Sequence, residues 1–396
     1  MMHLFINSLA ATAGGGLTYI RNVIPYFAGH GLRVTVALGP SLREEFRGLA
    51  NVEFLELEIP TVRRFWYEQR VLPEVIRQSG ADILLSTGNF ALRKSPVPQI
   101  LLSRNSIYTS PDFSRDLRSR REYRAWLDMR IRSVLAKKSI HWADVTVAPS
   151  EAFAAELKCW TGTQVISIHH GFDWDAFTQD PLPIASEINE KLRVPEGSLK
   201  LLFVSHYNYY RNFETLIRAL PILRARLAER SVKLFLTCQL SAGKNPGAYC
   251  PDVAANLVKT LGVSDMVIEL GAIPYRQLHR LYASVDLYVS PAYTETFAHP
   301  LVEAMAGGVP LVISDIPVHR EICRDAALYF KRFSPEDLTE RVVQAVRSPD
   351  LRKHMAAVGL ERSHHFSWKA HVDQIVDLSH KLMNSNGARA AGTGND

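Results

Sequence analysis

The stretch TETFAHPLVEAMAGGVP, residues 294–310, holds two carboxylates, Glu295 and Glu303, that are separated by seven residues. Pro300 suits the first position of an α-helix, and the apolar, helix-favouring run after it predicts that the helix continues. The Gly307-Gly308 pair, which is followed by a proline, predicts where that helix ends. The segment is therefore expected to be a loop that leads into a short helix.

The apolar run Leu287–Ser290 before this stretch predicts a buried strand. Glu295 is then expected in the loop after the strand, and Glu303 in the first turn of the helix. Backbone N–H groups around Thr296 to Leu301 would lie at the helix start, where they favour a bound anion such as a diphosphate. The spacing alone also allows a purely structural interpretation, in which Glu303 complements the helix dipole and Glu295 is a solvated loop acid.

The same segment resembles the E-x7-E signature of the retaining glycosyltransferases of the GT-B fold, in particular glycosyltransferase family 4. The resemblance continues in Asp286–Pro291, Glu321 and Asp325–Leu328, and a weaker similarity extends over nearly the whole chain. It implies an α/β fold class, with two doubly wound Rossmann-like domains that face a central cleft. In this fold the C-terminal helix crosses back to the first domain, and Phe366-Ser-Trp368 resembles the usual start of that helix.

Runs rich in Val, Ile and Leu alternate with helical patterns in both halves of the chain, as is typical of parallel sheets covered on both faces. The strands predicted in the first half are His3–Leu9, Val34–Gly39, Val52–Leu57, Ile83–Thr87, Gln99–Ser103, Val145–Pro149 and Val165–His169. Those predicted in the second half are Leu199–Ser205, Lys233–Cys238, Met266–Leu270, Leu287–Ser290, Leu311–Ser314 and Leu328–Phe330.

The 396 residues are too many for one ordinary core, so two domains are expected. The first, on the acceptor side, is predicted over residues 1–175 and is completed by a helix over 367–384. A segment rich in Asp, Pro and Glu predicts a linker over 176–198, and the nucleotide-sugar-binding domain follows over 199–366. The small, polar residues 385–396 predict a disordered tail.

The composition, with 47% hydrophobic and 22% charged residues, is typical of a soluble globular protein. No apolar run approaches the length that spans a bilayer, and the N-terminus lacks the basic region of a secretion signal. The four cysteines are scattered without metal-type spacing and give no reason to expect disulfides. A cytoplasmic location is therefore expected.

Residues 113–138 carry nine basic and three acidic side chains, an excess equal to the net charge of +6 of the whole chain. Apolar residues recur among them at helical spacing, which predicts one basic amphipathic helix. Such a helix can bind an anionic membrane surface, here the inner face of the cytoplasmic membrane, at roughly 1 kcal/mol per basic residue. The alternative is the solvated face of an ordinary domain. Nucleic acid is disfavoured as a partner, because no aromatic stacking platform accompanies the basic residues.

Three glycines, Gly14, Gly15 and Gly16, follow the first predicted strand and precede a helical pattern. Glycines allow a backbone to approach a phosphate closely, although a simple flexible turn is the alternative. They do not form a G-x-G-x-x-G fingerprint, so a nicotinamide dinucleotide is disfavoured. In the family that the chain resembles, the matching loop lies over the donor diphosphate.

His206 and Arg211 follow the first strand of the second half. A cation here can neutralise the charge that develops on a departing nucleoside diphosphate without a metal. Relatives usually have an Arg just after this strand and a Lys several residues later. Arg211 matches the Lys position, but His206 stands where the Arg usually is, and a neutral imidazole leaves one positive charge fewer.

The resemblance implies roles for several further residues. Glu303 is expected to accept hydrogen bonds from the ribose hydroxyls, and Glu295 to hold the donor sugar together with the backbone N–H groups of Thr296 and Phe297. Tyr275, after the turn that begins at Gly271, is expected at the nucleobase. Arg104 and Asn105 are expected on the acceptor side, where relatives often have a histidine that this chain lacks.

Asp173-x-Asp175 resembles a metal-binding DxD, and His169-His170 precedes it. The segment fits the interdomain H/N-G-x-D turn of family 4 better, and no further ligand cluster supports a metal site. We therefore expect neither a metal nor another cofactor.

The expected function is retaining transfer of a sugar from a nucleotide-sugar donor to a glycan or lipid-linked acceptor. It would proceed by front-face substitution, in which the leaving diphosphate takes the acceptor proton. Alternatives are a GT-B phosphorylase or nucleotide-sugar epimerase, a non-catalytic nucleotide-sugar-binding module, and a peripheral membrane scaffold. The donor base, the sugar and the acceptor cannot be read from the residues.

Overall fold

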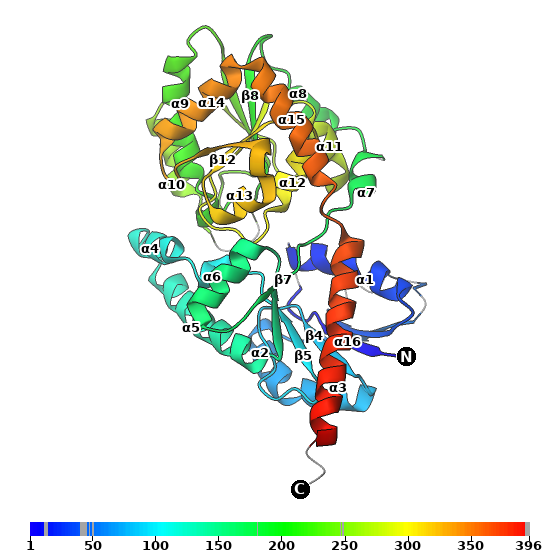
Figure 1. The fold of residues 1–396 in the computed structure, drawn as a ribbon. Coiled ribbons are helices and arrows are strands. Elements are labelled where there is room, and N and C mark those ends of the chain that lie inside the picture. Colours follow the sequence, from blue (N-terminus) through cyan, green and yellow to red (C-terminus); the bar gives the residue numbers. More distant parts are fainter. Residues whose placement is uncertain are drawn as a thin grey trace. The chain divides into compact units, whose positions relative to one another are not determined.

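The computed structural model describes residues 1–11, 15–39, 46, 48–49, 51–179, 181–245, 247 and 249–392. It consists of two compact units (Figure 1). The first unit comprises Met1–Thr109, Glu122–Gly171 and Ser367–Asp396, and the second comprises Ser110–Arg121 and Phe172–Phe366.

The first unit contains a seven-stranded parallel sheet in the order β3-β2-β1-β4-β5-β6-β7. Its strands are β1 (His3–Asn7), β2 (Arg33–Leu38), β3 (Val52–Glu56), β4 (Ile83–Ser86), β5 (Gln99–Leu102), β6 (Val145–Ala148) and β7 (Ile166–Ser167). Its helices are α1 (Gly15–Gly29), α2 (Thr61–Arg70), α3 (Leu72–Ser79), η2 (Ser106–Tyr108), α5 (Tyr123–Trp142), α6 (Glu151–Thr161) and α16 (Trp368–Gly392). The reversal of strand order at β1 is the doubly wound arrangement.

Both faces of this sheet are covered, because alternate residues of β1 point into different layers. Leu4 and Ile6 pack in the cluster that also holds residues of α1 and α16. Phe5 instead packs with Leu72 and Ile76 of α3. Strands buried on both faces have no polar side, which explains why the sequence shows apolar runs rather than alternation.

The second unit contains a six-stranded parallel sheet in the order β10-β9-β8-β11-β12-β13. Its strands are β8 (Leu199–Phe203), β9 (Val232–Leu236), β10 (Val267–Glu269), β11 (Leu287–Ser290), β12 (Leu311–Ser314) and β13 (Ala327–Phe330). Its helices are α4 (Pro111–Ser119), α7 (Trp174–Thr178), α8 (Ser186–Lys191), η3 (Tyr209–Arg211), α9 (Phe213–Arg226), α10 (Asp252–Thr260), α11 (Tyr275–Tyr282), α12 (His299–Ala306), α13 (Pro317–Cys323), η4 (Arg324–Ala326), α14 (Pro335–Arg347) and α15 (Pro349–Ser363). Every predicted strand has a counterpart, and the predicted α/β class with two doubly wound sheets is confirmed.

The C-terminal helix belongs to the first unit, as the fold class predicted. Trp368, Val372 and Ile375 of α16 are buried in the cluster that includes α1. The helix runs to Gly392, beyond the predicted end at residue 384, and residues 393–396 lie outside the described part. The predicted disorder of the tail over 385–396 stays a prediction.

The predicted single basic helix over 113–138 is wrong, because the structure has two helices there. α4 ends at Ser119 and α5 begins at Tyr123, and Arg121 between them has a left-handed backbone with φ 60°. Tertiary contacts outweigh helix propensity at this break, since Arg120 pairs with Asp116 and Glu214 in the second unit. The first 175 residues thus contribute α4 and the start of α7 to the second unit.

The residues predicted as a linker, 176–198, contain α8 and the end of α7 and form part of the second unit. In the described chain no helix is both long and apolar enough to cross a bilayer. All four cysteines, Cys159, Cys238, Cys250 and Cys323, are free.

Gly171 provides a test of how the first unit is assembled. A Cβ built at this position would overlap the backbone of Ser367 and Trp368, where the chain enters α16. Gly171→Ala is therefore expected to lower the free energy of unfolding by about 3 kcal/mol, measured by urea denaturation. The matched control is Gly29→Ala in α1, where no atom lies within 4 Å of the added Cβ. Equal stability of the two variants would contradict this packing.

Candidate functional site

The candidate site lies in the second unit, where β8 and β11 end. These strands are neighbours in the parallel sheet, so the loops after their carboxyl ends are adjacent. The loop after β8 contains His206 and η3, and the loop after β11 contains Glu295. Two hydrogen bonds join the loops, from Asn212 Nδ2 to Pro291 O at 3.0 Å and from Tyr293 N to Tyr210 O at 3.0 Å.

Arg211 and Glu295, which the sequence assigned to separate roles, form an ion pair between Nη1 and Oε1. The pair is largely shielded from solvent, with side-chain exposures of 18% and 9%. Arg211 Nε is also buried, and it has no hydrogen-bond acceptor in the part of the protein that the structure describes. The guanidinium can therefore bind a further acceptor, such as an oxygen of an anionic ligand.

Glu303 lies on α12, and its carboxylate is buried. The Tyr282 hydroxyl donates to Glu303 Oε2 at 3.1 Å, and the carbonyl of Pro300, at 3.2 Å, is the competing acceptor for the same proton. Oε1 has no hydrogen-bond partner among the described residues. Burial raises the pKa of Glu303 to about 7, and the hydrogen bond from Tyr282 opposes this shift.

The start of α12 differs from the prediction. Ala298 has a left-handed backbone with φ 66° and precedes the helix, which begins at His299. Glu303 is then the fifth helical residue rather than a first-turn residue, so the helix dipole does not explain its position. The N–H of Leu301, expected to be free for an anion, donates to Ala298 O at 3.0 Å. An alanine with positive φ is strained, and such strain often occurs at functional loops.

Thr296 and Phe297, the other two loop residues of the prediction, lie between Glu295 and α12. Phe297 is buried and packs against His299, with a centroid distance of 4.9 Å, and against Phe366 at 5.2 Å. Its ring thus anchors the loop that carries Glu295. The predicted role of the two backbone N–H groups stays a prediction.

Two imidazoles of this unit, those of His206 and His319, have lowered pKa values, which favours their neutral forms. Removal from water and, to a smaller extent, the nearby charge of Arg211 lower the pKa of His206. His206 therefore does not supply the second positive charge that relatives usually have. His319 is fully buried, and burial lowers its pKa to about 4. Its Nδ1 lies 2.9 Å from Ser314 O, so it serves the packing of α13.

Tyr275, the expected nucleobase contact, is the first residue of α11. Its ring packs against Phe177 of α7, with centroids 5.6 Å apart, and 45% of its surface is exposed. Partial burial and the nearby carboxylate of Glu303 raise the pKa of its hydroxyl. Tyr275 thus lies near Glu303, on the same helix as Tyr282.

The other predicted residues belong to the first unit. Gly14 lies outside the described residues, and Gly15 and Gly16 form the first turn of α1 rather than a loop. Arg104 contacts this turn, because its Nη1 donates to Gly15 O at 3.2 Å. Its guanidinium lies 4.6 Å from the centre of the Tyr19 ring. Its Nη2 donates to Thr87 O at 2.8 Å.

Asn105, the second acceptor-side residue, has a local role in the structure. Its side-chain oxygen accepts from Ile107 N at 3.3 Å and caps η2. The capping hydrogen bond uses one of the two lone pairs of this oxygen, so the oxygen can accept a second hydrogen bond.

The aspartates of the DxD-like segment are occupied by local contacts. Asp173 caps α7 by accepting from Ala176 N at 3.0 Å, and Asp175 accepts from Gln179 Nε2 at 2.7 Å. Among the described residues there is no group of three or more His, Cys, Asp or Glu side chains that could hold a metal ion.

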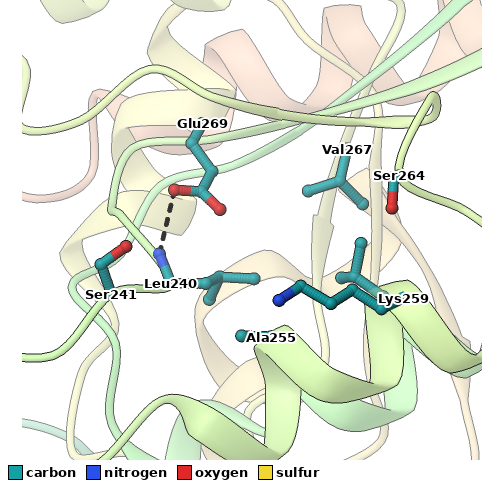
Figure 2. Close-up of a pocket in the computed structure, with 8 residues that line it drawn as sticks. Leu240, Ser241, Ala255, Lys259, Ser264, Val267 and Glu269 are labelled. Carbon is teal, nitrogen blue, oxygen red and sulfur yellow. Dashed lines mark hydrogen bonds between the residues drawn. The ribbon is translucent and has the colours of Figure 1, made fainter.

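A surface pocket of about 320 Å³ lies beside β10 and α10, also in the second unit (Figure 2). Lys259 and Glu269 lie on opposite sides of it, and Glu269 Oε2 accepts from Leu240 N at 3.1 Å. None of the site residues that were predicted from the sequence lines this pocket. The pocket is therefore separate from the Arg211–Glu295 pair and from Glu303.

The raised pKa of Glu303 predicts a pH-dependent stability. Between the ordinary value of 4.5 and about 7, the folded protein keeps a proton that the unfolded chain releases. The free energy of unfolding should therefore fall as the pH rises through this range, by roughly 3 kcal/mol in total. Glu303→Gln keeps an acceptor for Tyr282 and should remove this component. Urea denaturation at pH 5 and pH 8 tests it, and an identical pH dependence in both proteins would contradict it.

Comparison with protein families identifies the two halves of the chain. Residues 13–176 match the model described as Glycosyltransferase Family 4, and residues 185–362 match the model described as Glycosyl transferases group 1. Together the two models cover most of the chain.

Individual relatives agree with this assignment. A D-inositol 3-phosphate glycosyltransferase of Corynebacterium aurimucosum is 25% identical over 217 residues, which are 54% of this chain and 50% of that protein. The O-antigen chain mannosyltransferase B of Escherichia coli is 30% identical over 132 residues, 33% of this chain and 34% of the relative. The chain thus spans about half the length, or less, of these curated relatives.

Solved structures show the same fold. Sucrose-phosphate synthase from Thermosynechococcus elongatus is similar with a TM-score of 0.75 and 17% identity, covering 97% of this chain and 100% of that chain. Anabaena HepE, solved in complex with UDP, has a TM-score of 0.69 and 16% identity, covering 96% and 100%. With these strands, loops and family matches, the chain belongs to the glycosyltransferases of family 4, which have the GT-B fold.

Proposed function

We propose that this protein transfers a sugar from a nucleotide-sugar donor to a glycan or lipid-linked acceptor, with retention of anomeric configuration and without a metal. The observation that carries the proposal is the placement of Arg211, Glu295 and Glu303 at the carboxyl edge of one parallel sheet. Family membership supports it, as does the complex of the similar Anabaena structure with UDP. The carboxyl edge of such a sheet is also where ligands bind in doubly wound folds.

Glu303 is suited to a ribose. One oxygen already accepts from Tyr282, and the other has no partner among the described residues, so a ribose hydroxyl can donate to it. Because a hydroxyl donates best to an ionised carboxylate, binding would favour the charged form of a group whose pKa is about 7. Nucleotide affinity should consequently weaken as the pH falls below 7.

Arg211 is suited to the diphosphate. Its buried Nε has no acceptor among the described residues, while Nη1 is held by Glu295. A phosphate oxygen at Nε would satisfy this buried donor, and Glu295 would remain in place to accept hydrogen bonds from hydroxyls of the donor sugar. His206, being neutral, would add a hydrogen bond rather than a charge.

The proposed reaction is a front-face substitution. The bond between the anomeric carbon and the phosphate oxygen breaks, and the nucleoside diphosphate leaves with the electron pair. The acceptor oxygen bonds to the same face of the anomeric carbon, and its proton passes to an oxygen of the leaving diphosphate. Arg211 stabilises the charge that develops on that group, which is the role a metal has in other transferases. Arg104 and Asn105, in the first unit, are proposed for the acceptor side.

Nucleotide binding tests the assignment of Glu303 and Arg211. Thermal unfolding of the wild type should be measured with UDP, GDP, ADP, dTDP and their sugars, in EDTA and again with added Mg²⁺. One nucleotide family should raise the midpoint by several degrees when it is present at about 100 times its dissociation constant. The effect should be equal in EDTA, should be lost in Glu303→Ala, should be reduced but measurable in Arg211→Met, and should persist in Glu340→Gln.

Glu340 is a suitable control because it is exposed on α14 and pairs only with Arg226 in the described structure. A lack of response to every nucleotide would overturn the proposal. A response that requires Mg²⁺ would overturn metal independence alone.

Turnover assays separate the alternatives. Nucleotide release that needs an added glycan or lipid-linked acceptor supports transfer. Turnover that needs inorganic phosphate would indicate a phosphorylase, and isomerisation of the donor without an acceptor would indicate an epimerase. Nucleotide binding without transfer or hydrolysis would indicate a binding module.

We also propose that α5 binds an anionic membrane surface. Tyr123, Leu127, Ile131 and Val134 recur at helical spacing and are 53–61% exposed, an unusual number of large apolar side chains on one exposed stripe. The opposite face of α5 is the buried one, where Met129, Ser133, Ala136 and Ile140 pack into the first unit. Exposed Arg124, Arg130 and Lys138 accompany the stripe. Apolar residues among basic ones suit the interface of an anionic bilayer.

Vesicle sedimentation tests this surface. The wild type should bind vesicles that contain phosphatidylglycerol and not vesicles of phosphatidylcholine alone, and salt should weaken the binding. Leu127→Asp combined with Ile131→Asp should reduce the bound fraction about tenfold, since burial of two large side chains is lost. The control is Val253→Asp on α10, which is equally exposed. Unchanged binding of the double variant would contradict the proposal.

A further inference from the structure

Among the described helices that precede Gly171, α4 is the one that belongs to the second unit. Ser110 caps it by accepting from Phe113 N at 3.2 Å. Phe113 contacts Tyr210 edge-on with centroids 6.0 Å apart, and Asp112 pairs with Arg332 at 2.7 Å. The contact of Phe113 holds α4 against the loop that carries Arg211, and the pair with Arg332 joins α4 to the loop after β13.

Arg120, directly after α4, is the centre of a largely buried network. Its Nε donates to Asp116 Oδ1 at 2.7 Å, and its Nη2 pairs with Glu214 Oε1 at 2.9 Å. Its guanidinium also lies 4.2 Å from the centre of the Tyr209 ring. The side chains of the three charged residues are only 12–19% exposed, so each charge depends on its partners for compensation.

The network reaches both loops of the candidate site. On one side, the Tyr293 hydroxyl donates to Asp116 Oδ2 at 2.9 Å, and Glu295 follows two residues after Tyr293. On the other side, Arg120 stacks on Tyr209 in η3, the same one-turn helix that ends at Arg211. Tyr207 supports this side, because its hydroxyl donates to Glu214 Oε1 at 3.0 Å.

We propose that Arg120 is a positioning residue for the Arg211–Glu295 pair, and that α4 is a strap by which the first half of the chain aligns the donor site of the second unit. In the part of the chain that the structure describes, Arg120 forms no hydrogen bond or ion pair with either residue of the pair, and it acts through Tyr209, Asp116 and Tyr293. The inference rests on the proposed function, since it takes Arg211 and Glu295 to be donor-binding residues. It explains why a segment of the first half leaves its own unit next to this site.

Hydrogen exchange of the free protein tests the strap without any ligand. Two backbone amides report on the loops. Asn212 N donates to Tyr209 O at 2.9 Å within the first loop, and Tyr293 N donates to Tyr210 O at 3.0 Å between the two loops. Arg120→Met should accelerate their exchange about tenfold. In the wild type, opening of the loops must break the ionic network, and without Arg120 the free energy of local opening is lower. Tyr293→Phe, which removes a single hydroxyl and is the milder variant, should accelerate exchange at Tyr293's own amide more than at Asn212.

The matched control is Arg224→Met, which removes an exposed arginine that pairs with Asp265 in the same unit. Its exchange in both loops should equal that of the wild type. Equal exchange in Arg120→Met and Arg224→Met would overturn the inference, whatever the protein binds.

A double-mutant cycle tests the link to the donor. The probe is the nucleoside diphosphate, among UDP, GDP, ADP and dTDP, that stabilises the wild type most, and its dissociation constant is measured by calorimetry. Arg120→Met should weaken binding about tenfold in the wild-type background and less than about twofold in the Arg211→Met background, because Arg120 acts through Arg211. A general loss of stability would weaken binding equally in both backgrounds, and that result would overturn the positioning role. Absence of nucleotide binding in the wild type would overturn the proposed function instead, while hydrogen exchange would still decide the strap.

Discussion

The ion pair between Arg211 and Glu295 depends on the order of strands in one parallel sheet. Its two residues are 84 positions apart, and they meet because β8 and β11 are hydrogen-bonded neighbours whose carboxyl ends carry adjacent loops. A largely buried charge is tolerated only when it is compensated, so the pair also constrains both loops to one relative position. The bonds from Asn212 to Pro291 and from Tyr293 to Tyr210 hold the loops in the same position.

The two carboxylates of the E-x7-E signature have different partners, and they are therefore suited to different ligand groups. Glu295 faces a guanidinium, whereas the buried carboxylate of Glu303 faces the hydroxyl of Tyr282. A carboxylate without a cation is costly to ionise when buried, which is why the pKa of Glu303 rises to about 7. The first arrangement suits a site for charged groups, and the second suits a site for sugar hydroxyls.

The site was only partly predictable. Glu295, Glu303 and Arg211 were found from local spacing and from resemblance, because motifs around a strand–loop–helix unit are local in sequence. Tyr282 as the partner of Glu303 was missed, since nothing local connects a tyrosine on α11 with α12. His206 was recognised as a departure from the family, and only its surroundings showed that its imidazole is neutral. The roles of these residues, and those of Arg104 and Asn105 in the first unit, remain proposals.

By itself, the sequence determined the α/β class, all the strands and the two doubly wound sheets, because strand and helix patterns are set by residues close together in the chain. Tertiary structure alone decided the break between α4 and α5, the assignment of α4 to the second unit and the pairing of Arg211 with Glu295. The physical reason is the same in each case. A buried charge is stabilised by an opposite charge, which can come from a distant part of the chain. The partners of Arg120 and Arg211 include residues more than eighty positions away along the chain.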